Sequence, residues 1–108
     1  MKSLLRNAFA LSALLAWSGA TAGNGSGKVV HLIAHAGDIV MFKLDESHTG
    51  KPACSSNEWA LSLSTHSGRA MYALLLSAHS QGKRVVVQGA DACSAWSDRE
   101  APIYIYMQ

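Results

Sequence analysis

The sequence predicts a small, mainly β protein with α+β elements, in which five short strands form a barrel. Three observations predict it. Several segments alternate apolar and polar residues, one segment between them has helical spacing, and two cysteines lie far apart in a short chain. The predicted order is strand, strand, strand, helix, strand, strand. A generic α+β sandwich is the alternative for the same order.

The first 22 residues have the pattern of a secretory signal. Two cations lie in the first six residues, residues 8–17 are an apolar run, and Ala20 and Ala22 supply the small side chains that a signal peptidase requires. The apolar run is shorter than the roughly 20 residues of a membrane span. We therefore expect residues 1–22 to be a signal peptide that is removed on export, and residues 23–108 to form a single domain.

The charge of the chain points away from polyanionic partners. The 108 residues carry a net charge of +2, and the two cations of the leader account for it. The exported part is therefore neutral, and it shows no cationic tract. Such a chain is poorly suited to bind nucleic acid or an anionic membrane. We also expect no membrane span in the exported part, because no later segment is long and apolar enough.

Two segments with the pattern of strands follow a short, flexible, glycine-rich segment at 23–27. Residues 28–36 are rich in the β-branched and aliphatic side chains that favour extended structure. Residues 39–45 alternate apolar and polar side chains. Gly37 and Asp38 lie between the two segments. Together they predict a hairpin that turns at this pair.

A third strand is predicted after a polar loop. The loop spans residues 46–56, contains glycine and proline, and carries Cys54 near its end. Residues 58–64 then alternate, so that Trp59 and Leu61 lie on the same face. We expect that face to be buried and Trp59 to belong to the core.

The apolar period changes to that of a helix after the third strand. Thr65 or Ser67 can cap the start of this helix, and Gly82 lies where a left-handed terminal residue is wanted. The positions at helical spacing are Ala70, Met71, Leu74, Leu75 and Ala78. This pattern predicts a helix of about four turns.

Two strands complete the chain. Residues 83–88 are centred on three consecutive valines, and residues 103–107 alternate isoleucine with tyrosine. The polar loop between them, residues 89–102, carries Cys93 and Trp96. Five short strands with a helix between the third and the fourth is the order of elements in an OB-fold, a partly open five-stranded barrel. We predict an OB-fold-like barrel for the exported domain.

Cys54 and Cys93 predict one disulfide bond. An even number of cysteines in a small exported chain is typical of a disulfide, and the chain has no C-x-x-C pair. Closing a loop of this size stabilises a fold by about 4 kcal/mol in the chain-entropy model. Two free thiols, or half of a metal site, are the alternatives.

The stretch around Cys54 and Trp59, the helix after it and the valine-rich strand before Cys93 together resemble a family of small exported bacterial OB-fold proteins. This family includes the glycan-binding B subunit of subtilase cytotoxin. The resemblance covers most of residues 27–108, and it implies a disulfide-bonded OB-fold that can assemble as a ring of five. It also implies, with a one-residue shift of the local alignment, that Ser26 matches a glycan-binding serine just before the first strand.

Three further residues are candidates for ligand contacts. Trp96 and Asp98 share a polar loop, where an aromatic ring can stack on a sugar face and a carboxylate can bind its hydroxyls. Packing of Trp96 over the barrel end, beside the disulfide, is the alternative. Tyr104 shares a strand face with Tyr106, which suits a binding surface, a subunit contact or one-sided sheet packing.

The sequence predicts neither a metal site nor an active site. His31 and His35 are four residues apart, which on a strand separates them by about 13 Å. We expect the histidines of the chain to be solvated or to cap the helix. No nucleophile motif is present, and Asp98 and Glu100 merely flank Arg99 in a loop. We expect no cofactor and no enzymatic activity.

These observations together predict a secreted or periplasmic, non-catalytic binding module. The resemblance implies a glycan as its ligand. The alternative is a periplasmic module that binds or inhibits another protein, which requires only a stable scaffold and exposed loops. A homo-oligomer, such as the pentamer that the resemblance implies, fits a partly open barrel whose last strand can pair with a second copy.

Overall fold

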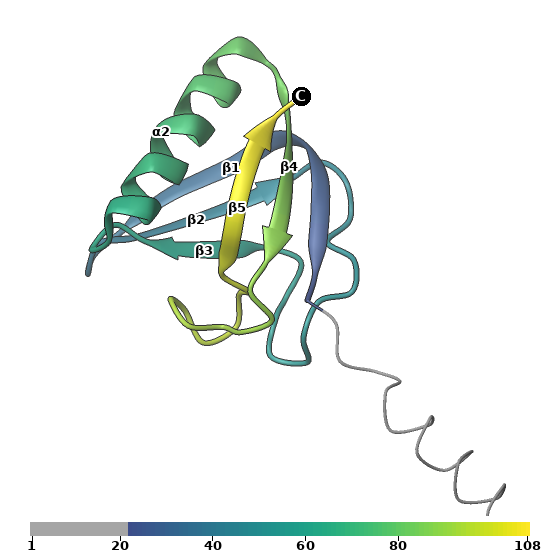
Figure 1. Ribbon diagram of the computed structural model, residues 1–108, viewed down its shortest axis with the longest axis vertical. Helices are drawn as coiled ribbons and strands as arrows, with labels where there is room; N and C mark the ends of the chain where they lie inside the picture. The colour runs from purple at the N-terminus through teal and green to yellow at the C-terminus, as the bar shows by residue number, and fades with distance from the viewer. Residues whose placement is uncertain (1–21) are drawn as a thin grey trace, which may run out of the picture.

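A computed structural model describes residues 22–108. In chain order these residues form β1 (Asn24–His35), β2 (Ile39–Leu44), β3 (Trp59–Ser62), α2 (His66–Gln81), β4 (Arg84–Gly89) and β5 (Pro102–Met107) (Figure 1). The prediction of a mainly β fold with five strands and one helix is therefore confirmed. The predicted signal peptide lies outside the described residues, apart from Ala22.

The five strands form one antiparallel sheet in the order β3-β2-β1-β4-β5. The edge strands β3 and β5 approach each other only at one end, where an isolated parallel bridge joins Trp59 to Glu100. This bridge uses the first residue of β3 and a residue that precedes β5. No ladder therefore runs between the two edges, and the sheet does not close into the barrel that the sequence predicts.

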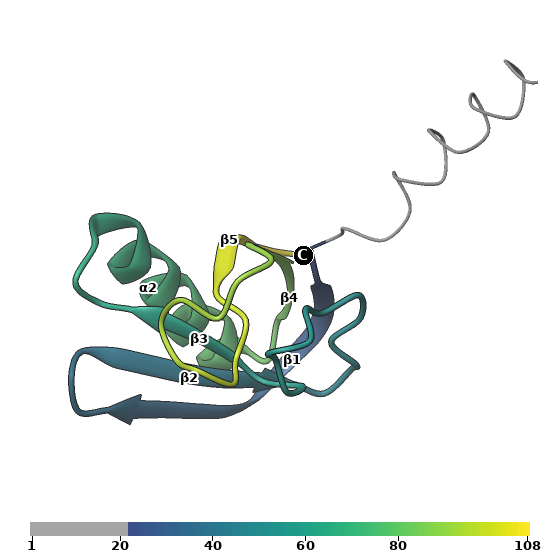
Figure 2. The ribbon, with the colours of Figure 1, turned by 90° about the horizontal axis from the view of Figure 1, so that it is seen from below.

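Strand β1 belongs to both halves of the sheet because it bends sharply near Gly27. Its first part pairs with β4, and its second part pairs with β2 in a long hairpin (Figure 2). The φ angle of Gly27 is +134°, and a Cβ atom there would lie 2.3 Å from Oδ1 of Asp45. The same Asp45 oxygen accepts a 2.9 Å hydrogen bond from the N–H of Lys28. The bend therefore requires glycine and is braced by Asp45.

The expectation that residues 23–27 form a flexible segment is wrong. Residues from Asn24 onward pair with β4 through backbone hydrogen bonds, which do not depend on the side chains that mark a strand in sequence. The glycines also serve packing, since a Cβ atom at Gly25 would lie 3.4 Å from the ring of Trp59. The first strand therefore begins four residues before the predicted one.

Helix α2 begins after Thr65, the first of the two predicted caps, and ends at the predicted Gly82. The hydroxyl of Thr65 accepts a 3.0 Å hydrogen bond from the N–H of Gly68, and Gly82 ends the helix with a φ of +64°. Leu75 and Ala78 project from α2 into the core, between the two halves of the sheet. The core consists of Val29, Val40, Phe42, Leu44, Trp59, Leu61, Leu75, Ala78, Val85, Val87 and Ile105. Burial of Trp59 is confirmed.

The predicted disulfide bond is present. Cys54 and Cys93 are bonded, with their Cα atoms 6.3 Å apart, and they join the loop after β2 to the loop before β5. The two loops lie at the same end of the molecule (Figure 1). Within residues 22–108 no helix combines the length and the apolar character needed to cross a membrane.

Candidate functional site

The outward side of β1, β4 and β5 brings two of the predicted ligand-binding residues onto one surface. Residues directly opposite each other in an antiparallel pair share a face. Ser26 lies opposite Val86, and Val86 lies opposite Tyr106. We call this surface the tyrosine face. It consists of Asn24, Ser26, Arg84, Val86, Gln88, Tyr104 and Tyr106.

The alternating residues of β4 and β5 explain why the tyrosines point outward. Val85, Val87 and Ile105 fill the core side of these strands and are buried. Because side chains alternate along a strand, Tyr104 and Tyr106 must then point to the opposite side. Tyr104 is 49% exposed and Tyr106 is 50% exposed, and their ring centroids lie 6.2 Å apart with an interplanar angle of 26°. The pair offers a broad aromatic surface to solvent.

Polar groups surround this aromatic pair. In the row beside Tyr104, Oδ1 of Asn24 accepts a 2.9 Å hydrogen bond from the hydroxyl of Thr49. In the row beside Tyr106, the hydroxyl of Ser26 donates a 3.4 Å hydrogen bond to Glu46. The amide of Asn24 and the hydroxyl of Ser26 therefore lie on β1, which β4 separates from the tyrosines of β5.

An exposed ion pair borders the same surface. Nη1 of Arg84 binds Oε2 of Glu46. This hydrogen bond lowers the pKa of the Glu46 carboxyl, and the attraction of the guanidinium charge acts in the same direction. Glu46 is therefore ionised at neutral pH. The tyrosine face thus offers aromatic, hydroxyl, amide, cationic and anionic groups together, the kinds of group that position a polar ligand in a site.

A shallow hollow adjoins this face on the far side of β5. It measures about 250 Å³ and lies between α2 and β5. Met71 and Leu74 line it from the helix, and Ile103 and Tyr104 line it from the strand. Tyr104 therefore lies between the apolar hollow and the polar rows of the tyrosine face.

The other two predicted ligand-binding residues lie elsewhere. Trp96 is half-buried in the loop before β5, where its ring meets His35 edge-on with a centroid separation of 4.7 Å. His35 ends β1, whereas Ser26 lies near its start. The exposed Asp98 accepts a 2.7 Å hydrogen bond from Nη1 of Arg99. The four candidates therefore divide into Ser26 with Tyr104, and Trp96 with Asp98.

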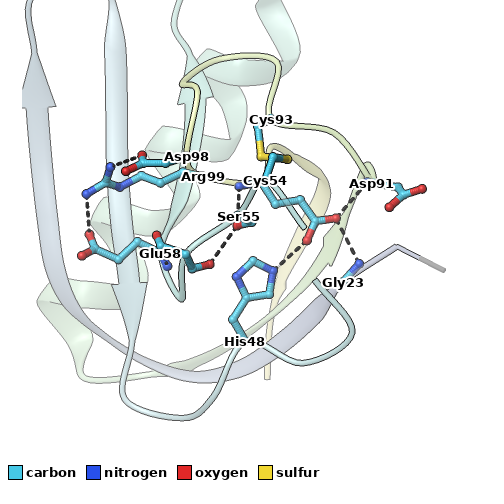
Figure 3. Close-up of a disulfide and its surroundings, with 11 residues drawn as sticks. Gly23, His48, Cys54, Ser55, Glu58, Asp91, Cys93, Asp98 and Arg99 are labelled. Carbon is cyan, nitrogen blue, oxygen red and sulfur yellow. Dashed lines mark hydrogen bonds and ion pairs between the residues drawn. A yellow bond between two sulfur atoms is a disulfide. The ribbon is translucent and has the colours of Figure 1, made fainter. Parts of the chain in front are cut away.

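The sequence patterns did not identify a buried polar cluster beside the disulfide (Figure 3). Its centre is Glu100, which is 0% exposed. One carboxylate oxygen binds Nε2 of His48 at 2.7 Å, and the other accepts hydrogen bonds from the N–H groups of Gly23 at 3.0 Å and Asp91 at 2.8 Å. We call these four residues the Glu100 cluster. Glu100 and His48 are 52 positions apart, and no spacing rule connects such a pair.

His48 corrects the expectation that the histidines of this chain are solvated or cap the helix. It is only 4% exposed, and its ring stacks on Trp59 with a centroid separation of 3.7 Å. Burial lowers the pKa of His48 below its usual value and outweighs the opposing hydrogen bond with Glu100. Burial therefore favours the uncharged imidazole, whose Nε2 lies in hydrogen-bond contact with Oε1 of Glu100.

The geometry of this cluster does not form a nucleophile with its base. The buried hydroxyl of Ser55 accepts a 2.8 Å hydrogen bond from the N–H of Glu100 and donates one of 2.8 Å to the carbonyl of Ser56. His48 is bonded to Glu100 and not to this hydroxyl. The described residues also contain no group of three His, Cys, Asp or Glu side chains that could hold a metal ion. The cluster instead links the loops that the disulfide joins.

Comparison with protein family models, with curated protein sequences and with solved structures found no match to this chain.

Proposed function

We propose that the chain is an exported, non-catalytic binding module that binds a glycan on the tyrosine face. The observation that carries this proposal is the pair of adjacent, half-exposed tyrosines beside rows of polar side chains. The apolar side of a sugar ring packs on an aromatic ring, while hydroxyl, amide and charged side chains bind its hydroxyl groups. The position of Ser26 on the same face agrees with the sequence resemblance described above.

The same resemblance leads us to propose an OB-type architecture. OB-folds are five-stranded and only partly closed. Two features support this proposal: β1 is shared between the two halves of the sheet, and the Trp59–Glu100 bridge joins the edge strands at one end. We further propose that the exported protein assembles into a homo-oligomer, with a pentamer as the state to test, through the unpaired edge of β5.

A protein–protein module is the second candidate function, and one observation favours it. Ile103 is 59% exposed on β5, and this edge strand can pair with a strand of a partner. A periplasmic binding or inhibitory role would place the protein partner along β5. The molar mass of the exported protein in solution distinguishes the two candidates. A mass of several copies would indicate self-assembly through this edge, whereas the mass of one copy would leave the edge available to another protein.

A glycan array tests the first proposal. The exported protein is labelled and applied to the array, and each bound glycan is then titrated with the protein and its variants. We expect the combined change Tyr104→Ala and Tyr106→Ala to weaken binding about fivefold to 150-fold, since each aromatic contact is worth about 0.5–1.5 kcal/mol. Ser26→Phe should also abolish binding, because its bulky ring would cover the polar row.

Two control variants locate the site. Leu76→Ala removes an apolar side chain of similar exposure, 44%, from α2 and should leave the affinity unchanged. Trp96→Ala alters the other candidate pair and should also leave it unchanged. Loss of binding in Trp96→Ala but not in the tyrosine variant would move the site to the loop before β5. Absence of binding to every glycan would contradict the glycan proposal itself.

A further inference from the structure

Gly23 is the first residue after the predicted cleavage point, and it is buried in the Glu100 cluster. Its N–H donates a 3.0 Å hydrogen bond to Oε2 of Glu100. Its carbonyl accepts hydrogen bonds from the N–H of Gly89 at 2.8 Å and from Nε2 of Gln88 at 3.3 Å. The nitrogen that signal cleavage would release is therefore fixed against a buried carboxylate.

The residue that follows Gly23 is held equally firmly. The N–H of Asn24 donates to the carbonyl of Thr49 at 2.8 Å, and the N–H of Thr49 donates back to the carbonyl of Asn24 at 2.8 Å. This reciprocal pair and the contacts of Gly23 fix the backbone on both sides. The position of the Gly23 nitrogen is therefore set by the folded domain.

The fold, and not the peptidase, explains why residue 23 is a glycine. The cleavage pattern places small side chains at Ala20 and Ala22, before the cut. A Cβ atom at Gly23 would lie 2.2 Å from Oε1 of Glu100 and 2.7 Å from Nε2 of His48. Any side chain there would displace the carboxylate or the imidazole. Only glycine lets the nitrogen of this residue reach Glu100.

The charge of the cluster is unbalanced while Gly23 carries an ordinary peptide N–H. Glu100 is fully buried, and burying a carboxylate is costly unless a cation accompanies it. Among the described residues, the ion pairs of lysine and arginine join Arg84 to Glu46 and Arg99 to Glu58 and Asp98, none of them to Glu100. The partners of Glu100 are two backbone N–H groups and the imidazole of His48, whose pKa burial lowers.

We propose that the junction between Ala22 and Gly23 is a processing site whose new amino terminus forms a buried ion pair with Glu100. Water hydrolyses the peptide bond, so that Ala22 gains a carboxylate and the nitrogen of Gly23 becomes a protonated amine. The nitrogen then carries a positive charge and three N–H donors in place of one. Glu100 thereby gains a cationic partner in place of a neutral N–H donor.

Cleavage before Gly23 and packing of the Glu100 cluster must then occur in a fixed order. Once Gly23 is bound in the cluster, the peptide bond before it lies against the folded domain, and an extended chain can no longer be presented to a peptidase. Cleavage therefore precedes the final packing of the Glu100 cluster. The uncleaved precursor retains only the single N–H donor, so that the ion pair stabilises the mature protein selectively.

The first test determines where the mature chain begins. The full chain is exported from a bacterial host, and the product is analysed by intact mass and by stepwise amino-terminal sequencing. We expect the product to begin at Gly23. A mature chain that begins at any other residue would overturn the proposal, because its free amine would not coincide with the nitrogen that contacts Glu100.

The second test measures the ion pair by a double-mutant cycle in urea. Chains that begin at Gly23 or at Ala22 are released from a fusion partner without extra residues, each with Glu100 or with Glu100→Gln. Retention of Ala22 should raise the unfolding equilibrium constant about tenfold to a hundredfold when Glu100 is present, as expected for loss of a charged hydrogen bond. With Glu100→Gln the same extension should change it less than about threefold.

A control variant and a chemical probe complete the test. Glu46→Gln removes a carboxylate that is half-exposed and should leave the effect of the extra Ala22 unchanged. An amine-selective acylating reagent should modify the terminal amine at least tenfold more slowly in the chain from Gly23 than in the chain from Ala22. This probe also applies where Glu100→Gln does not fold. Equal stability of the two chains, or equal rates of acylation, would overturn the ion pair.

Discussion

Removal of the disulfide should cost this protein a large part of its stability. The double variant Cys54→Ala and Cys93→Ala opens a covalent loop with a sequence separation of 39. The chain-entropy model assigns about 4 kcal/mol to closing such a loop. Cys54 is exposed and Cys93 is half-buried, so that truncation of the two side chains creates no buried cavity. The decrease in unfolding free energy therefore measures mainly how much the disulfide restricts the unfolded chain.

This loss is large relative to the stability of such a domain. At roughly 0.05–0.15 kcal/mol per residue, a domain that spans residues 23–108 has an unfolding free energy of about 4–13 kcal/mol. A domain of this size loses about 4–8 °C in Tm for each kcal/mol. We therefore expect the double variant to unfold roughly 15–30 °C below the native protein, or to be unfolded at 37 °C.

Urea titration followed by circular dichroism measures this prediction. The midpoint and the slope are compared for the oxidised protein, for the double variant and for the native protein kept in reductant. The reduced protein should lose as much stability as the double variant, because both lack the same loop closure. A loss below about 1 kcal/mol, or two titratable thiols in the oxidised protein, would refute the reasoning.

Two further predictions concern the buried polar cluster and the bend of β1. Because burial lowers the pKa of His48, the unfolded chain binds a proton near pH 6.5 that the folded chain resists. The contribution of the uncharged His48 to stability is therefore complete above that pH and declines as the pH falls. Urea midpoints measured from pH 8 to pH 5 report this decline. A similar decline in the variant His48→Gln would contradict the assignment to His48. Gly27→Ala should cost roughly 1–3 kcal/mol in the same assay, since it adds a clash with Asp45 to an unfavourable φ. Gly37→Ala, at a turn where the added Cβ meets no atom within 4 Å, should cost less, and equal losses would show that the clash is absent.

Local patterns predicted most of the elements of this fold. The alternation around Trp59 placed β3 and identified a core residue. Gly82 marked the end of α2, and its start was predicted to within the choice between Thr65 and Ser67. These signals act within a few residues and survive in the folded state because burial reinforces them. The first strand was predicted to begin too late. Its start at Asn24 rests on backbone pairing through a glycine-rich segment that has few side chains to reveal it.

The surface was harder to predict than the elements. Tyr104 and Tyr106 could be placed on one strand face from their spacing, but not beside Ser26, because that neighbourhood depends on the strand order β1-β4-β5. The loop that contains Trp96 has the composition of a binding loop, yet the ring of Trp96 packs against His35. A residue pattern along the chain describes what a loop contains, whereas contact depends on which segment the fold brings next to it.

The buried pair of Glu100 and His48 had no sequence signal, because polar residues in glycine- and serine-rich loops are ordinarily solvated. What distinguishes them is the convergence of two loops and of the segment at Gly23 on one small volume. Glu100 fixes the nitrogen of Gly23, while Gln88 binds the carbonyl of the same residue and also lies on the tyrosine face. The contacts that fix Gly23 are therefore continuous with the proposed binding surface. Processing at Gly23 would then do more than release the exported protein, since it would also fix the first row of the tyrosine face.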